Sequence, residues 1–243
     1  MRDNKTDQAE SQIQLTNEIL AKPALLSAYI DHTLLKADAS MTQIEKLCAE
    51  AIQYSFKAVC VNPCRVAVAS SYLNSSKVLI ASVVGFPLGA SASSAKAFET
   101  ELAVQDGASE IDMVINIGWL KEKEFKLVSK DINAVVEAAG PHRVKVILET
   151  GLLTKEEIQS ACKISEDSGA HFVKTSTGFL GRGASIEDIQ IMFESISRKI
   201  EIKASGGITD LRFACDLIAA GATRVGTSSG VQLVQNLTAT SSY

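Results

Sequence analysis

The chain has 243 residues and a formal net charge of −4, with 46% hydrophobic and 21% charged residues. This length suits one large α/β domain, and the apolar fraction is sufficient for a sizeable core. The net negative charge gives no electrostatic reason to expect binding to nucleic acid. No run of 18 apolar residues occurs, so we expect neither a transmembrane helix nor a membrane partner.

Short apolar runs rich in Val and Ile alternate with longer helical patterns along most of the chain. In chain order, the predicted strands are Tyr29–His32, Ala58–Val61, Val78–Val84, Ile111–Ile115, Val144–Leu148, Phe172–Lys174, Glu201–Ala204 and Arg224–Gly226. Eight strands that alternate with helices predict parallel βαβ units that close into a single (β/α)₈ TIM barrel. We expect a short N-terminal helical extension over residues 1–24, the barrel over 25–236 and a flexible C-terminal tail over 237–243.

Polar residues mark the starts of the predicted helices. The expected N-caps are Ser40, Ser93 or Ser94, Thr154, Ser185 and Thr209. Thr154 is followed three residues later by Glu157, the spacing of a capping box. A Gly-Ala pair recurs at residues 107–108, 169–170 and 221–222, each time between a helix and a strand, and we expect each glycine to end its helix in a left-handed conformation.

An open doubly wound sheet is the alternative architecture for such a pattern. That fold carries a GxGxxG turn after its first strand, and no such turn follows here. The sequence therefore favours the barrel.

Several predicted strands carry ionisable residues where a barrel interior should be apolar. Alternation along each strand directs Asp112, Lys174 and Lys203 inward. Each alone could be a solvated or paired residue, but buried charges are costly unless they are paired or used, so the set predicts a functional cluster.

Such a cluster permits covalent chemistry by a lysine. A second ammonium group and burial both favour the neutral amine, which can attack an aldehyde and form a Schiff base. Asp112 could then carry protons. On this basis either Lys174 or Lys203 could be the nucleophile.

Glycine- and serine-rich turns follow the last three predicted strands. They contain Thr177, Gly178, Gly206, Gly207, Ser228 and Ser229. Barrel active sites form at the carboxyl ends of the strands, and phosphate sites often use the loops after the last two. These turns therefore predict a phosphorylated substrate.

Five scattered cysteines without a CxxC pair favour free thiols in a reducing compartment, and the N-terminus lacks the apolar segment of a secretory signal. We therefore expect a cytoplasmic protein. The three histidines are isolated, so we expect neither a metal nor another cofactor.

Seven motifs resemble the deoxyribose-phosphate aldolase family over about residues 25 to 236. They are YIDHTLLK, FKAVCVNP, VVGFPLGA, EIDMVINIG, VKVILETG, FVKTSTGF and IKASGGI. The resemblance implies a class I aldolase that reversibly cleaves 2-deoxy-D-ribose 5-phosphate to D-glyceraldehyde 3-phosphate and acetaldehyde, in deoxyribonucleotide and carbohydrate catabolism. Its expected partners are these sugar phosphate and aldehyde substrates and further copies of the chain, in a dimer or tetramer.

The resemblance also implies roles for individual residues. Lys174 forms the Schiff base, Lys203 tunes its pKa and Asp112 carries protons. The residues expected to line the pocket or join the proton network are Asp31, Thr33, Cys60, Asn62 and Lys145.

Two features stay open after the resemblance. Many relatives continue the STGF motif as a Gly-Gly-Ala-Thr turn, whereas this chain reads Gly-Arg-Gly-Ala-Ser over residues 181–185. Arg182 could touch the substrate phosphate or face solvent, and we expect solvent. Tyr243 ends a small polar tail, and its phenol is a candidate proton relay, although such tails are usually dispensable.

Other functions would use the same barrel differently. A phosphate-binding isomerase or synthase would use Asp112 as a general base and would not need Lys174. A sugar-phosphate-binding regulator would need none of the three charged residues, and their presence together argues against it.

Overall fold

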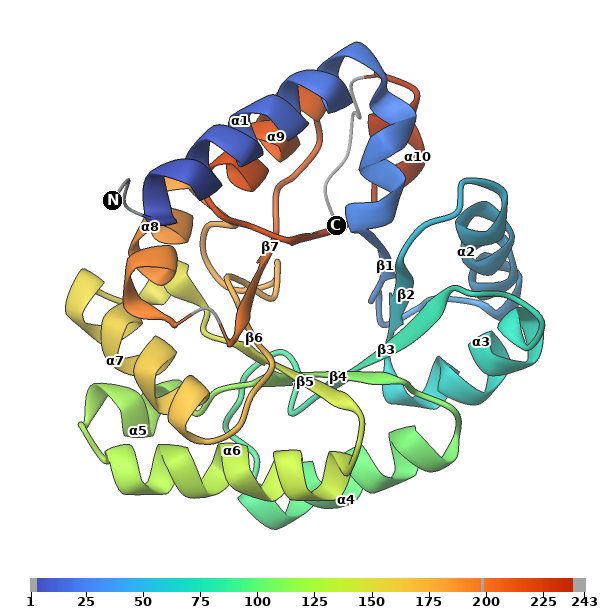
Figure 1. The fold of residues 1–243 in the computed structure, drawn as a ribbon. Coiled ribbons are helices and arrows are strands. Elements are labelled where there is room, and N and C mark those ends of the chain that lie inside the picture. Colours follow the sequence, from blue (N-terminus) through green and yellow to red (C-terminus); the bar gives the residue numbers. More distant parts are fainter. Residues whose placement is uncertain (1–3, 198, 238–243) are drawn as a thin grey trace.

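The computed structural model describes residues 4–197 and 199–237. Eight parallel strands form a closed barrel in the order of the sequence, and helices surround it (Figure 1). The strands are β1 (Ile30–Leu34), β2 (Ala58–Val61), β3 (Leu79–Val84), β4 (Glu110–Val114), β5 (Arg143–Ile147), β6 (Phe172–Lys174), β7 (Glu201–Ser205) and β8 (Arg224–Thr227). The predicted (β/α)₈ fold is confirmed, and the open sheet is excluded because β1 pairs with β8.

The helices cover the outside of the barrel, and short 3₁₀ turns lie at Pro23–Tyr29, Pro63–Arg65 and Thr150–Leu152. The α-helices are α1 (Asn4–Ala21), α2 (Met41–Gln53), α3 (Val66–Leu73), α4 (Ser93–Gln105), α5 (Ile117–Lys121), α6 (Phe125–Ala139), α7 (Lys155–Asp167), α8 (Ile186–Ser195), α9 (Leu211–Ala219) and α10 (Gly230–Val234). Helix α1 precedes the barrel and lies against α9 (Figure 1). None of the helices in the described part of the chain is long and apolar enough to span a membrane.

Helix starts follow the predicted N-caps in three places. The hydroxyls of Ser40, Thr154 and Ser185 each accept a hydrogen bond from the backbone N–H three residues on. The capping box of Thr154 with Glu157 is confirmed. All three glycines of the Gly-Ala pairs have positive φ, as expected of helix-ending residues.

Two predicted N-caps are wrong. Helix α4 begins at Ser93 itself, and its N-cap position is Ala92, which makes no side-chain cap. Helix α9 is capped by Asp210 rather than Thr209, because the Asp210 carboxylate accepts from the backbone N–H of Phe213 at 2.8 Å. The strand ends also differ from the predicted ones by one or two residues in six cases.

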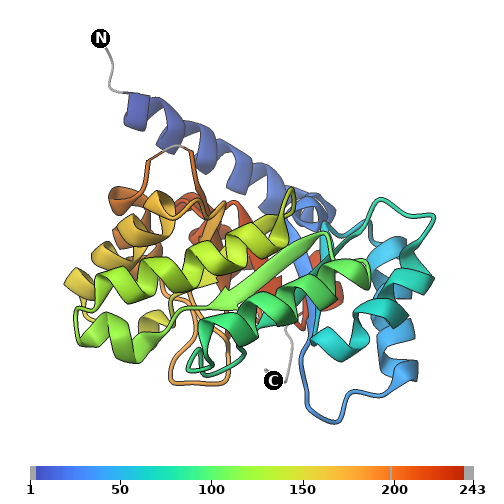
Figure 2. The ribbon, with the colours of Figure 1, turned by 90° about the horizontal axis from the view of Figure 1, so that it is seen from below.

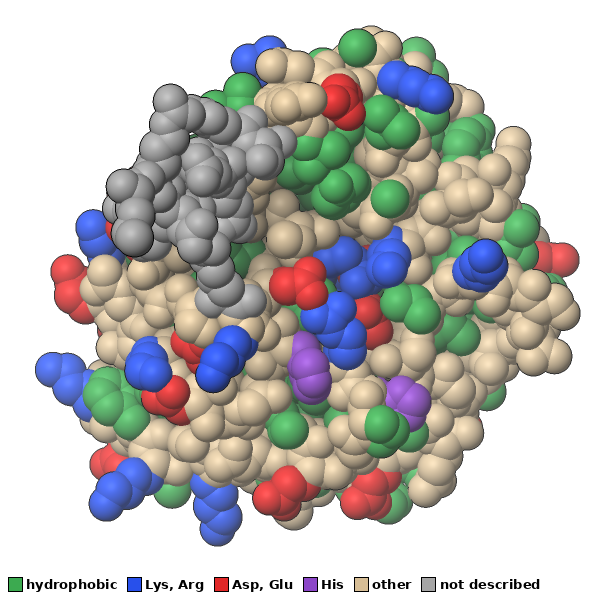
Figure 3. Space-filling model, viewed as in Figure 1, with side chains coloured by type: hydrophobic (Ala, Val, Ile, Leu, Met, Phe, Trp, Pro, Cys, Tyr) green, Lys and Arg blue, Asp and Glu red, His purple; other side chains and the backbone are tan. Residues whose placement is uncertain are grey.

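The apolar core has two parts. The larger part lies between the strands and the helices and includes Val173, Ile202 and Ala204, so these side chains point outward, opposite to Lys174 and Lys203. The smaller part contains Leu35, Cys60, Ala81 and Val83. The remainder of the barrel interior is largely polar, and Figure 3 shows charged side chains gathered at the centre of one face of the molecule.

A buried ion pair joins two of the outer helices. The Lys96 ammonium on α4 contacts the Asp131 carboxylate on α6 at 2.5 Å and donates to the carbonyl oxygen of Val114 at 2.9 Å. Both side chains are fully buried. Figure 2 shows α4 and α6 crossing the outside of the barrel beside β4, so the pair ties these helices to the end of that strand.

Candidate active site

Asp112 lies at the centre of a buried charge cluster inside the barrel. Its Oδ1 accepts from Lys145 at 2.7 Å, and its Oδ2 accepts from Lys174 at 2.9 Å and from Lys203 at 2.7 Å. The three lysines come from β5, β6 and β7, whose register places Lys174 beside Lys203. The structure therefore brings together the three residues that the sequence singled out, with Lys145 as a fourth.

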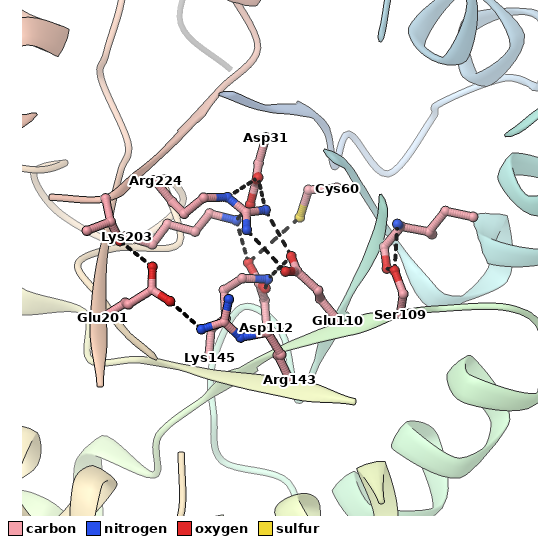
Figure 4. A network of polar contacts seen from close by, with 12 residues as sticks. Asp31, Cys60, Ser109, Glu110, Asp112, Arg143, Lys145, Glu201, Lys203 and Arg224 are labelled. Carbon is pink, nitrogen blue, oxygen red and sulfur yellow. Dashed lines mark hydrogen bonds and ion pairs between the residues drawn. The ribbon is translucent and has the colours of Figure 1, made fainter. Parts of the chain in front are cut away.

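A second set of contacts joins β1, β4 and β8 (Figure 4). The Asp31 carboxylate contacts Lys203 at 2.5 Å and accepts from Arg224 Nε at 2.9 Å. Arg224 also donates to both oxygens of Glu110, at 3.1 and 2.9 Å, and Glu110 contacts Lys145 at 2.6 Å. All these side chains are buried, so none of the pairs is screened by bulk water.

The carboxylates of this cluster are held in the ionised form. Burial disfavours their charge, but Lys145, Lys174 and Lys203 together hold the pKa of Asp112 well below its usual range. Asp31 is likewise buried, and Lys203 and Arg224 lower its pKa. Asp112 is therefore available as a proton acceptor.

The two central lysines have opposite pKa shifts. Burial lowers the pKa of Lys174, and the neighbouring Lys203 lowers it further against the opposing effect of Asp112. Burial opposes the charge of Lys203 too, but Asp112 and Asp31 together raise its pKa. Lys174 is thus the lysine of the pair that more readily becomes a neutral amine. Both effects expected from the sequence, burial and repulsion by a second ammonium group, lower the pKa of Lys174, and burial is the larger cause.

The predicted pocket residues of β1 and β2 lie on neighbouring strands. Thr33 pairs in register with Cys60, and the Cys60 sulfur lies 4.0 Å from Asp112 Oδ2. Burial raises the pKa of Cys60, which favours the thiol. Asn62, just after β2, donates its side-chain amide to the carbonyl oxygen of Leu35 at 3.1 Å and is only partly buried.

The loop after β6 is fixed by a buried carboxylate. The backbone N–H of Thr177 donates to Glu149 at 3.2 Å, and the Thr177 hydroxyl also donates to Glu149. Glu149 has a φ of 58°, a left-handed conformation that is rare for a non-glycine residue, and burial raises its pKa. Its contacts with Thr177 and its interaction with Lys174 place this carboxylate beside the charge cluster.

The loops after β6 and β7 touch through glycines. A Cβ on Gly183 would lie 2.1 Å from the carbonyl oxygen of Gly206, so only glycine fits there. The backbone N–H of Ala184 donates to that same oxygen at 3.0 Å. Gly207, by contrast, faces open space, and Gly178 has a positive φ of 84°.

The loop after β8 holds the two predicted serines. Ser229 is buried, and its backbone N–H donates to the Thr227 hydroxyl at 2.9 Å, whereas Ser228 is partly exposed. This loop follows directly on β8, at the same end of the barrel as Gly206 and Gly207. The structure therefore brings the predicted phosphate-binding turns to one rim.

Arg182 is exposed to solvent, as expected, but it is also paired. Its guanidinium forms a two-pronged ion pair with Asp188 of α8, with Nη2 and Oδ1 2.9 Å apart. Asp188 also accepts from Thr150 at 2.8 Å. Arg182 therefore braces the loop after β6 against α8 while half of its side chain stays exposed.

Three buried charged residues of the site were not singled out from the sequence: Glu110, Glu149 and Arg224. Glu110 lies two residues before Asp112 on β4, so the alternation that directs Asp112 inward directs Glu110 inward as well. Arg224 begins a strand that the sequence identified, and the same rule applies to it. Glu149 follows its strand in an irregular turn, where alternation gives no signal.

Two other expectations concern the C-terminal tyrosine and metal binding. Tyr243 lies outside the described residues. Within residues 4–197 and 199–237, no group of three or more His, Cys, Asp or Glu side chains is arranged to hold a metal ion.

Comparison with known proteins gives a consistent result over most of the chain. A family model described as DeoC/LacD family aldolase matches residues 25–236. A relative named deoxyribose-phosphate aldolase, from Staphylococcus carnosus (strain TM300), is 55% identical over 215 residues, which is 88% of this chain and 98% of the relative. A relative from Staphylococcus aureus (strain N315), named deoxyribose-phosphate aldolase 1, is 54% identical over the same share of each chain.

Solved structures agree. A structure described as a unique tetrameric deoxyribose phosphate aldolase from Aeropyrum pernix superposes with a TM-score of 0.85 at 30% identity, covering 92% of this chain and 95% of that one. A structure described as QR15, an aldolase, has a TM-score of 0.83 at 40% identity and covers 86% of this chain and 94% of that one.

Proposed function

The chain belongs to the DeoC/LacD family of aldolases, and from this membership we propose that Lys174 is its Schiff-base nucleophile. The enzyme is a class I aldolase, and its reaction is the reversible cleavage of 2-deoxy-D-ribose 5-phosphate to D-glyceraldehyde 3-phosphate and acetaldehyde. The observation that carries the residue assignment is the lowered pKa of Lys174, which ends β6 with Asp112 as its hydrogen-bond partner.

The chemistry uses the neutral amine of Lys174. It attacks the aldehyde carbon of the open-chain sugar, and loss of water gives an imine whose protonated nitrogen withdraws electrons. The C3 hydroxyl then loses its proton and becomes the aldehyde of D-glyceraldehyde 3-phosphate as the bond between C2 and C3 breaks. The electron pair of that bond moves toward the nitrogen, and the remaining two carbons stay on Lys174 as an enamine. Protonation of the enamine carbon and hydrolysis release acetaldehyde and restore Lys174.

Proton transfer falls to Asp112 in this proposal. Its carboxylate lies 2.9 Å from the Lys174 nitrogen and is ionised, so it can accept a proton directly or through one water molecule. Lys203 keeps its own charge beside Lys174 and favours the neutral amine by repulsion. Lys145 holds the other oxygen of Asp112 and fixes its orientation.

The rim loops are the proposed substrate contacts. Backbone N–H groups near Gly206, Gly207, Ser228 and Ser229 would bind the phosphate, because they lie after β7 and β8 on the rim where Lys174 ends its strand. Thr33, Cys60, Asn62, Thr177 and Gly178 would line the sugar pocket, and Asp31 would act mainly by holding Lys203. Residues 25–236 would form the catalytic domain, with residues 1–24 as an extension and 237–243 as a tail.

The assembly and the location of the enzyme are also proposals. A dimer or tetramer in the cytoplasm fits the family, and the relative from Aeropyrum pernix is described as tetrameric. Sedimentation of the purified protein would test the assembly.

Trapping with borohydride tests the nucleophile. Incubation with acetaldehyde and borohydride should leave a stable adduct on Lys174, found by peptide mass spectrometry. Lys174→Arg should abolish both the adduct and turnover, because a guanidinium stays protonated. Lys46→Arg is the matched control, since Lys46 is three-quarters exposed, and it should keep both. An isomerase or synthase that works through Asp112 alone would give no adduct.

A further inference from the structure

Six ionised side chains inside the barrel form a closed ring of alternating charge. Each cation contacts two carboxylates, and each carboxylate contacts two cations (Figure 4). In order around the ring, the residues are Arg224, Asp31, Lys203, Asp112, Lys145 and Glu110.

Arg224 lies opposite Asp112 in this ring. It is the first residue of β8, and its guanidinium joins Asp31 on β1 to Glu110 at the start of β4. It also lies 5.8 Å from the centre of the Phe172 ring. Its contacts with two carboxylates are the link that joins the two halves of the ring.

The ring is electrically neutral without Lys174. It holds three cations and three carboxylates, and each of the six side chains is at most 4% exposed. Lys174 contacts the ring only through Asp112 Oδ2, so a protonated Lys174 would add a fourth positive charge to a buried set with three negative ones. An unbalanced buried charge is costly, and the neutral amine avoids it.

We propose that Arg224 is a positioning residue for the aldolase reaction, which completes the charge balance of the ring and thereby keeps Lys174 a neutral amine. This role rests on the proposed function, because it requires Lys174 to be the nucleophile. Arg224 acts through the ring and makes no described contact with Lys174.

The groups that face Lys174 come from several elements. Asp112 and Lys203 lie on β4 and β7, Cys60 on β2, and Glu149 in the turn after β5. Around Arg224 the charged groups are Asp31, Glu110 and Lys203, from β1, β4 and β7. Cys60 and Glu149 stay unchanged in every variant proposed for the ring, so differences in the Lys174 pKa between these variants report on the charge of the ring.

Two single substitutions change this charge in opposite directions. Arg224→Gln leaves the ring with one excess negative charge and should raise the pKa of Lys174. Glu110→Gln leaves one excess positive charge and should lower it. A unit charge about 10 Å away, at an effective dielectric constant near 20, shifts a pKa by about one unit, which is the expected size of each change.

Two further variants keep the ring neutral. They are the double variant Arg224→Gln/Glu110→Gln and the conservative variant Arg224→Lys. In both, the Lys174 pKa should lie within a few tenths of a unit of the wild-type value, roughly the additivity error of such mutant cycles. Arg143→Gln is the matched control. Arg143 begins β5, and its guanidinium lies 4.3 Å from the centre of the Phe172 ring, but Arg143 is half-exposed and outside the ion ring.

The measurement is the pH dependence of labelling of Lys174 by an amine reagent, counted by mass spectrometry on the folded full-length protein. Opposite shifts in the single variants with recovery in the double variant support the role of Arg224. Unchanged values, or shifts in the same direction, would show that the ring only braces the barrel. If Arg224→Gln does not fold, the shift of Glu110→Gln and its reversal in the double variant decide the question, and failure of either overturns the proposal.

Borohydride trapping, run beside the labelling, separates this proposal from the proposed function. Absence of an acetaldehyde adduct on wild-type Lys174 would remove the nucleophile assignment whatever the labelling shows. An adduct at Lys174 with no shift among the ring variants would remove only the role of Arg224.

Discussion

The side chain of Lys203 crosses the barrel directly beside Gly226 of the neighbouring strand. A Cβ on Gly226 would lie 3.0 Å from Lys203 Cε and 3.0 Å from Ser205 Cβ, which is closer than side chains normally pack. Gly226 is paired in register with Asp31 on one side and Ser205 on the other. Because Gly226 has no side chain, Lys203 has the space to reach Asp31 and Asp112.

Gly226→Ala should displace Lys203 and lower activity. We expect kcat/KM to fall about 10- to 100-fold, since small displacements of catalytic groups have effects of this size, and the free energy of unfolding to fall by about 1–3 kcal/mol through overpacking. Gly118→Ala is the control, because Gly118 lies in a helix where a Cβ would meet its nearest atom at 3.4 Å. Steady-state kinetics and urea unfolding measure both effects, and wild-type values for Gly226→Ala would contradict the packing argument.

Lys203→Leu should change the shape of the pH profile. Removing this cation raises the pKa of Lys174, so the fraction of neutral amine at pH 7 falls by about tenfold for each unit of increase. The rate should fall most near neutral pH and recover in part at higher pH. Lys163→Leu removes an exposed lysine and should leave the profile unchanged. A profile of kcat/KM with the wild-type shape would show that Lys203 does not tune the nucleophile.

Lys96→Met should destabilise the fold by leaving the Asp131 carboxylate buried without its partner. Breaking a buried ion pair from one side costs about 3–5 kcal/mol. The double variant Lys96→Met/Asp131→Leu removes both charges and should recover most of that loss. Urea unfolding followed by circular dichroism measures the difference, and equal stability of the single and double variants would contradict the expectation.

Activity should survive chelation by EDTA. In the proposed mechanism the protonated imine withdraws the electrons that a metal ion would otherwise accept. Turnover is measured before and after dialysis against EDTA. Loss of activity with recovery on adding zinc would overturn the mechanism.

Tyr243→Phe tests the proposed proton relay of the C-terminal residue. If the phenol carries a proton to or from the enamine, turnover should slow far more than substrate binding weakens, and deletion of Tyr243 should act alike without changing thermal stability. The decisive measurement is exchange of the acetaldehyde methyl protons in deuterated buffer. Exchange at the wild-type rate in Tyr243→Phe would show that the tail takes no part.

The barrel and the centre of its site could be predicted from the sequence because both depend on local periodicity. Alternation on β4, β6 and β7 was sufficient to direct Asp112, Lys174 and Lys203 inward, and the closed sheet confirms that direction. The same rule would have identified Glu110, which lies two residues before Asp112.

Other features depend on contacts that the periodicity of apolar residues along the sequence cannot predict. Thr209 and Asp210 are both good N-cap residues, and only the hydrogen bond to Phe213 distinguishes them. Arg182 meets Asp188 because the loop after β6 turns back onto α8. The role of burial as the larger cause of the Lys174 shift also required the assembled barrel.

The ion ring links the first strand of the barrel to the last. Asp31 and Arg224 are 193 residues apart in the chain, so synthesis produces Lys174 well before the cation that completes the balance. The ring can close only when β8 has paired with β1, so the buried and charge-balanced surroundings of Lys174 depend on a closed barrel. Recovery of aldehyde reactivity at Lys174 during refolding should therefore follow the closure of the barrel.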